Sequence, residues 1–117
     1  MPAAIDLNHL NQYVCGDAAL LDEILTIFEG QAELWIEKLN PSLEDEAWRN
    51  ACHALKGASR GIGAWAVGDL CEKGEKLFAG APEKVAKRSE LLKDLKRKLA
   101  AVVDESRRIR DGQRRAS

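Results

Sequence analysis

Residues 51–64 read Ala51-Cys52-His53-Ala54-Leu55-Lys56-Gly57-Ala58-Ser59-Arg60-Gly61-Ile62-Gly63-Ala64. At about 100° per residue, most small and apolar side chains of this stretch fall on one arc of a helix, centred on Leu55. His53 lies roughly 160° from that centre. The stretch therefore predicts an amphipathic helix that turns its imidazole to water, and Gly61 and Gly63 are expected to end it.

The arc around His53 is rich in positive charge. Arg49 lies four residues before it, Lys56 three after it and Arg60 seven after it, spacings that place side chains side by side on a helix. Gly57 shares this arc, although a glycine inside a helix costs about 0.5–1 kcal/mol relative to alanine. The pattern indicates a site for an anion or a phosphoryl group, with Gly57 leaving the space. A histidine without function and a glycine that permits close helix packing are the structural alternatives.

Helical periodicity continues along the chain, without the alternation typical of strands. We expect five helices, over residues 6–14, 17–39, 42–61, 65–78 and 83–103. Asp6 and Asp17 are the expected N-caps of the first two, and Ser42-Leu43-Glu44-Asp45 resembles a capping box for the third. Because short connections between long helices favour antiparallel neighbours, the sequence predicts an all-α fold. It would be an antiparallel up-down four-helix bundle with a short additional N-terminal helix.

Composition indicates a soluble globular protein. The 117 residues are 45% apolar and 32% charged, and no apolar run approaches the roughly 20 residues of a membrane helix. No secretory signal is recognisable at the N-terminus, so a cytoplasmic location is expected and a membrane partner is not. The three cysteines form neither an even set nor a Cys-x-x-Cys pair, which argues against disulfides and structural zinc. Because neither an ATP-binding loop nor a carboxylate cluster for magnesium is present, no cofactor or metal is expected.

Charge is distributed unevenly along the chain. Residues 1–82 hold 13 acidic and 6 basic side chains, whereas residues 83–117 hold 6 acidic and 12 basic ones. We expect the helical bundle to span residues 1–104, and residues 105–117 to form a basic helix end with a disordered tail. A basic end can bind nucleic acid, but no aromatic residue or groove-reading motif accompanies these arginines. A solvated helix end is therefore the favoured interpretation, and nucleic acid is not an expected partner.

The run His53-Ala54-Leu55-Lys56-Gly57-Ala58-Ser59, followed by Gly63-Ala64, resembles a known signature. It is similar to the His-x-Leu-Lys-Gly-x-Ser-x-x-x-Gly-Ala pattern of the histidine-containing phosphotransfer (HPt) domains of bacterial multistep phosphorelays. Leu70-Cys71-Glu72 and Glu75 lie where that family has its fourth-helix pattern. Ile5-Asp6-Leu7 and the expected five helices extend the resemblance over most of the chain.

The resemblance implies a role for several residues. His53 would take a phosphoryl group on a ring nitrogen, Lys56 would stabilise that group, and Gly57 would make room for it. Glu75 would hold the nearer imidazole N–H and so fix the tautomer, with Glu72 or a water as alternatives and a solvated glutamate without a role as the third. The chain would be a phosphoryl carrier without its own kinase activity. Its partners would be the receiver domain of a response regulator and a hybrid sensor histidine kinase.

The second predicted helix carries more apolar surface than one buried face explains. Leu20, Ile27 and Leu34 recur every seven residues and widen its apolar arc to about 200°, against about 100° for an ordinary surface helix. One interpretation is that the first helix covers this flank. Our hypothesis is that the part near His53 stays exposed, and that Ile27, Leu34, Arg49 and Arg60 bind the receiver domain.

A second class of function fits the same bundle. A non-catalytic helical adaptor would bind a signalling partner through the apolar flank without phosphorylation. Such a protein would need no particular residue at position 53. Substitution of His53 therefore distinguishes the two classes.

Overall fold

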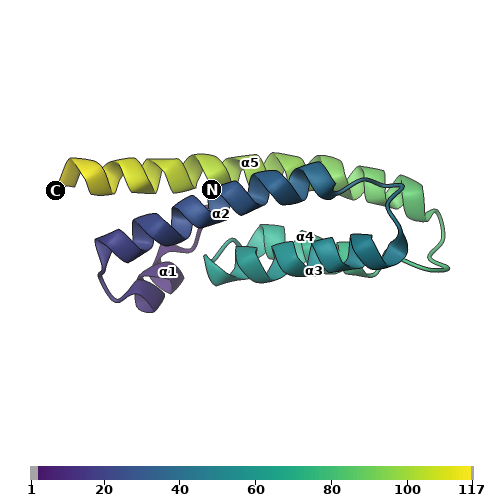
Figure 1. Ribbon diagram of the computed structural model, residues 1–117, viewed down its shortest axis with the longest axis horizontal. Coiled ribbons are helices and arrows are strands. Elements are labelled where there is room, and N and C mark those ends of the chain that lie inside the picture. Colours follow the sequence, from purple (N-terminus) through teal and green to yellow (C-terminus); the bar gives the residue numbers. More distant parts are fainter. Residues whose placement is uncertain (1–2, 117) are drawn as a thin grey trace.

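The computed structural model describes the backbone of residues 3–116 and the side chains of residues 3–112. Residues 3–116 form helices and connections without a strand. The helices are α1 (Leu7–Val14), α2 (Ala18–Lys38), α3 (Asp45–Gly61), α4 (Trp65–Glu75) and α5 (Lys84–Ala116). The four long helices run alternately up and down, and α1 lies beside the N-terminal part of α2 (Figure 1). The predicted antiparallel four-helix bundle with a short N-terminal helix is confirmed.

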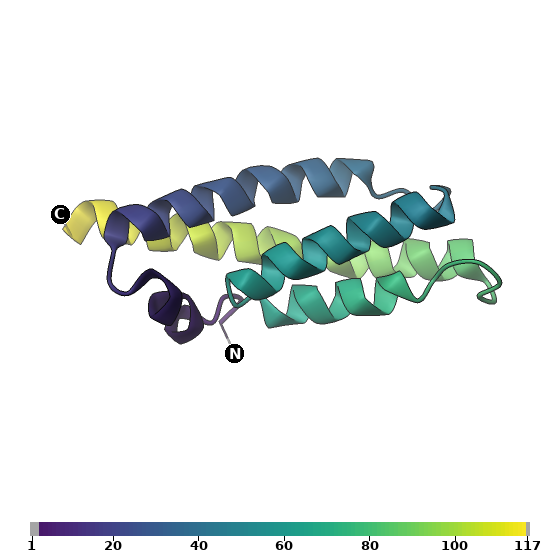
Figure 2. The ribbon, with the colours of Figure 1, turned by 60° about the horizontal axis from the view of Figure 1, so that its bottom comes forward.

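The helices α3 and α4 form the most closely packed pair of the bundle. Figure 2 shows α3 in front, between α2 and α4, with α5 behind. The arc predicted for α3 is buried, with the indole of Trp48 and the side chain of Leu55 inaccessible to solvent. Leu25 of α2 and Leu95 of α5 meet this face in the core. None of the described helices combines the length and apolar character that a membrane span needs.

Local capping explains where the first two helices begin. The Asp6 carboxylate accepts from the backbone N–H of His9 at 3.1 Å, and that of Asp17 accepts from the N–H of Leu20 at 3.0 Å. Each bond satisfies one of the N–H groups that a helix leaves unpaired at its start. Both predicted N-caps are confirmed.

The predicted capping box of α3 is not present. The helix begins at Asp45 after Glu44, which makes no side-chain cap bond. The carboxylate of Asp45 accepts instead from the Ala79 N–H at 3.0 Å, from Lys84 at 2.7 Å and from Arg88 at 2.9 Å. Because these donors come from the α4–α5 connection and α5, the start of α3 is fixed by tertiary contacts.

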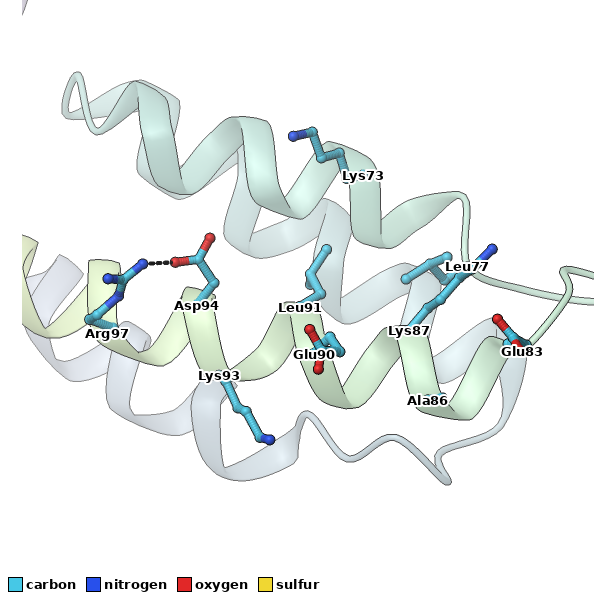
Figure 3. A pocket seen from close by; sticks show the side chains of 10 residues that line it. All are labelled: Lys73, Leu77, Glu83, Ala86, Lys87, Glu90, Leu91, Lys93, Asp94 and Arg97. Atoms are coloured by element: carbon cyan, nitrogen blue, oxygen red, sulfur yellow. Dashed lines mark hydrogen bonds and ion pairs between the residues drawn. The ribbon is translucent and has the colours of Figure 1, made fainter.

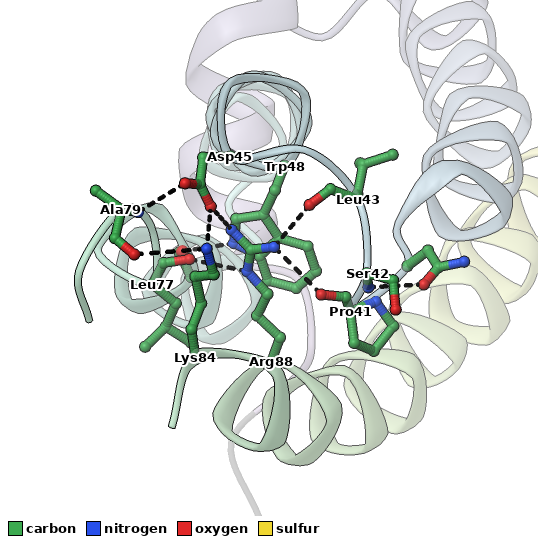
Figure 4. Close-up of polar contacts among 11 residues, drawn as sticks. Pro41, Ser42, Leu43, Asp45, Trp48, Leu77, Ala79, Lys84 and Arg88 are labelled. Atoms are coloured by element: carbon green, nitrogen blue, oxygen red, sulfur yellow. Dashed lines mark hydrogen bonds and ion pairs between the residues drawn. The ribbon is translucent and has the colours of Figure 1, made fainter. Parts of the chain in front are cut away.

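A buried arginine joins the elements at this end of the bundle (Figure 4). Arg88 of α5 is 1% exposed, and its guanidinium lies 4.6 Å from the centre of the Trp48 ring. It also donates to Asp45 and to three backbone carbonyls, those of Pro41, Leu43 and Leu77. A buried guanidinium needs such acceptors because desolvation of an unpaired charge is costly. The connections before α3 and after α4 are thereby tied to α5.

Two large apolar residues near the connection between α4 and α5 lie at the surface. The fourth helix ends at Glu75 rather than continuing to Phe78, and Phe78 is 36% exposed. The carbonyl of Gly74 is taken by Leu77 N–H and by the indole of Trp48, so the chain leaves the helix here. Val85 is 51% exposed because Arg88, one turn later, faces the interior in its place.

The last helix extends past residue 104, the expected end of the bundle, into the segment expected to form a basic helix end with a disordered tail. Helix α5 continues to Ala116, and Ser106 is fully buried. Arg110 pairs with Asp22 at 3.0 Å and with Glu29 at 3.1 Å, both on α2. Residues 105–112 therefore pack along α2, because acidic groups on that helix match the basic end. Ser117, the last residue of the predicted tail, lies outside the described residues.

Candidate functional site

The imidazole of His53 stands on the outer face of α3, as its position in the sequence predicts. Its side chain is 75% exposed. It borders a hollow of about 660 Å³ whose lining side chains come from α3, from the end of α4 and from the residues after α4. They are Asp45, Glu46, Arg49, Asn50, His53, Lys56, Glu75 and Phe78. The ring is thus reachable by a second protein while its base is held by the bundle.

Glu75, the last residue of α4, reaches across to α3. Its Oε1 lies 3.1 Å from Nδ1 of His53 and 3.0 Å from Nζ of Lys56, and its Oε2 accepts from Lys56 at 3.1 Å. One carboxylate therefore joins both residues. Glu72 does not serve in its place, because its carboxylate pairs with Arg60 at 3.2 Å.

The charge of Glu75 assigns the tautomer of His53. Burial raises the pKa of the Glu75 carboxyl, but hydrogen bonds from Lys56 and His53 outweigh burial and bring the pKa below its usual 4.5. At neutral pH the group is ionised and can only accept hydrogen bonds. Nδ1 must then carry the imidazole proton, and the lone pair lies on Nε2. None of the described side chains bonds to Nε2, which is left for an incoming group.

The other residues of the predicted arc lie in different surroundings. A Cβ added at Gly57 would meet nothing within 4 Å, so helix packing does not require this glycine. The guanidinium of Arg49 lies 5.0 Å from the centre of the Phe78 ring and borders the same hollow as His53. Arg60 instead pairs with Asp69 and Glu72 of α4. These ion pairs link α3 to α4, and the Arg60 side chain stays 35% exposed, so its contact with a partner remains a prediction.

Two residues of the predicted α2 flank are exposed. Ile27 is 51% and Leu34 57% exposed. The first helix buries Leu10 and Val14 but leaves these two side chains uncovered. A groove of about 250 Å³ runs from Ile27 to Gly57, so apolar surface and the space above α3 are continuous.

Sequence reasoning missed three lining residues. Phe78 and Asn50 line the hollow at His53, and Tyr13 of α1, which is 70% exposed, lines the groove beside Ile27. Asn50 lies three residues before His53, a spacing that placed it on the same helix face. Phe78 and Tyr13 carry no such signal, because they reach the site through the fold.

A larger groove elsewhere lacks comparable chemistry. It has a volume of about 920 Å³ and lies between α4 and α5, where Figure 3 shows side chains of alternating charge. Asp94 and Arg97 in this groove pair with each other. Neither histidine of the chain lines it. The hollow at His53 is therefore the better candidate for a functional site.

The chain matches a protein family and a solved structure. The family model described as Hpt domain matches residues 20–105, and the chain belongs to this family. It is similar to the crystal structure of the histidine phosphotransferase ShpA from Caulobacter crescentus, with 32% identity and a TM-score of 0.55. The match covers 91% of this chain and 97% of that one. No curated protein sequence matches the chain. At the level of the family, the chain is a phosphoryl carrier of phosphorelays, in which HPt domains interact with receiver domains and histidine kinases.

The depressed pKa of Glu75 makes a prediction about stability. A carboxyl whose pKa is lower in the folded state stabilises the fold above its unfolded pKa, and this contribution is lost as the pH falls through the folded value. Urea unfolding should show wild type more stable than Glu75→Gln at neutral pH, with the difference shrinking below pH 4.5. Glu33→Gln, at an exposed position of α2, is the control. A difference that stays constant into acid would contradict the pairing.

Proposed function

We propose that His53 accepts a phosphoryl group on Nε2 and passes it on. The donor is a phosphorylated receiver domain or a hybrid sensor histidine kinase, and the acceptor is the receiver aspartate of a response regulator. The observation that carries this proposal is the bond between Nδ1 of His53 and the Glu75 carboxylate. It leaves the opposite nitrogen both nucleophilic and exposed.

The transfer step balances without a cofactor on this chain. The Nε2 lone pair attacks the phosphorus of the partner's aspartyl phosphate, and the bond from phosphorus to the aspartyl oxygen breaks. The aspartate leaves as a carboxylate. Nδ1 keeps its proton, so the phosphorylated ring gains positive charge, which the Glu75 carboxylate stabilises from 3.1 Å. Attack by a second receiver aspartate reverses these changes.

Lys56 and Gly57 suit the arriving group in different ways. The ammonium of Lys56 is held beside the ring by Glu75, and a phosphoryl group on Nε2 would offer it additional oxygen acceptors. The space above Gly57 would take the phosphoryl oxygens. Arg49, at the rim of the hollow, adds positive potential that attracts an anionic partner.

We further propose that the α2 flank docks the receiver domain. Ile27 lines the groove that leads to Gly57, and Leu34 presents a second exposed apolar side chain on the same helix. Burial of exposed apolar area, surrounded by charge, is the usual source of binding energy at such surfaces. A receiver domain bound to this flank of α2 would then lie next to His53.

The central test is a pair of histidine substitutions. His53→Gln should abolish uptake of the phosphoryl group from a phosphorylated receiver domain, because the amide offers no nucleophilic nitrogen. His9→Gln changes the only other histidine and should leave uptake unchanged. Uptake is measured as transfer of radiolabelled phosphate. Acid-labile label retained in His53→Gln would refute the site, whereas partner binding with no label in any variant would favour the adaptor.

Filling the space above Gly57 should lower phosphoryl uptake while it raises the stability of the helix. Gly57→Gln should block uptake, because its side chain fills the space next to Nε2. The same change should stabilise the helix by up to about 1 kcal/mol, since glycine is a poor helix former. Gly112→Gln, at another helical glycine with open space, is the control and should keep full uptake. Normal uptake by Gly57→Gln would show that the open space has no role.

The docking flank is tested with charge substitutions. Ile27→Asp and Leu34→Asp should each slow transfer from a receiver domain by about tenfold, as expected when an apolar contact worth about 1.4 kcal/mol is lost. Helicity measured by circular dichroism should stay unchanged because both side chains are exposed. Val85→Asp, equally exposed but on α5, is the matched control. Unchanged transfer rates in both α2 variants would remove the flank from the interface.

A further inference from the structure

The last turn of α4 is held by a buried contact from α3. The indole N–H of Trp48 donates to the carbonyl of Gly74 at 2.8 Å, and the indole is inaccessible to solvent. The carbonyls of a final helical turn lack partners within the helix and fray easily. Glu75, the next residue, is the last one of α4. The indole therefore fixes the turn from which the carboxylate reaches His53.

Close packing of the two helices occurs at the same place. A Cβ added at Gly74 would lie 2.9 Å from Sγ of Cys52, so only glycine lets the helices approach this far without a shift. Cys52 and Gly74 directly precede His53 and Glu75 in the chain. The spacing of α3 and α4 at Cys52 and Gly74 therefore sets the distance that the Glu75 side chain must span to contact His53.

Arg88 supports the same junction from α5. Its guanidinium lies against the Trp48 ring, and its Nε donates to the carbonyl of Leu77 at 2.8 Å. Figure 4 shows Arg88 between the indole and the residues that follow α4. The indole is thus held in the orientation that points its N–H at Gly74.

We propose that Trp48 and Gly74 are positioning residues that hold Glu75 against Nδ1 of His53 and so set the tautomer of the phosphoryl-accepting ring. The inference rests on the proposed function. Neither residue contacts the imidazole in the structure; they act through Glu75. If the last turn of α4 loosens, Nδ1 loses its acceptor, the proton can occupy Nε2, and the ring loses its exposed lone pair.

The experiment is nitrogen NMR of His53 in the unphosphorylated chain, which reports the tautomer without any partner. Trp48→Phe removes the N–H but keeps an aromatic ring. It should raise the fraction of the Nε2–H tautomer toward that of Glu75→Gln, and should slow phosphoryl uptake by about threefold to tenfold. Trp65→Phe is the matched control, because its indole also donates to one acceptor, Asp6 at 3.0 Å, and does not border the His53 hollow. It should leave the tautomer unchanged.

A double substitution separates positioning from general destabilisation. In a Glu75→Gln background, Trp48→Phe should have no further effect on tautomer or uptake, since it acts through the missing carboxylate. Gly74→Ala is the second variant and should shift the tautomer in the same direction. A wild-type tautomer in both folded variants would overturn the inference, as would loss of cooperative unfolding in both, which would make these residues core elements only.

The two proposals fail in different ways. A shifted tautomer in Trp48→Phe with unchanged uptake would leave Trp48 as a positioning residue for Glu75 and would show that the tautomer does not control transfer. If Trp48→Phe leaves the tautomer unchanged while His53→Gln still abolishes uptake, the phosphoryl-carrier function stands and Trp48 has no positioning role. The partner-free measurement thus distinguishes the two.

Discussion

The close approach of α3 and α4 is the constraint on which the site depends. Two buried residues, Cys52 and Gly74, meet there with room for only one side chain, and the next residue on each helix forms the pair His53 and Glu75. The Glu75 carboxylate on one helix thereby lies within hydrogen-bond distance of Nδ1 of the imidazole on the other. The rest of the bundle, including the buried Arg88, holds this spacing.

Much of the fold was predictable because helical periodicity and N-caps are local signals. The buried arc of α3 and the exposure of His53 follow from residue spacing alone. The end of α4 at Glu75 does not, because an indole from α3 competes for its last carbonyls. Likewise, Arg110 pairs with Asp22 and Glu29 far away in the sequence, so local charge gave no sign that the basic end packs on α2.

The candidate site was predictable in composition but not in geometry. Spacing on one helix placed Lys56 and Gly57 beside His53, and the structure adds that Lys56 is paired with Glu75. The reach of Glu75 depends on how two helices cross, which no single-helix pattern contains. For Arg60, the pattern on α3 alone did not reveal its ion pairs with Asp69 and Glu72 on the neighbouring helix.

The exposure of His53 has a consequence for the lifetime of a phosphorylated state. Because the imidazole is 75% exposed and the helical turn below it has no side chain at Gly57, a group attached to it would be open to bulk solvent. In the proposed function, hydrolysis then competes with hand-off whenever the chain is unbound. Such a carrier suits brief storage between encounters, and in the proposed complex the docked receiver domain would shield the phosphoryl group from water.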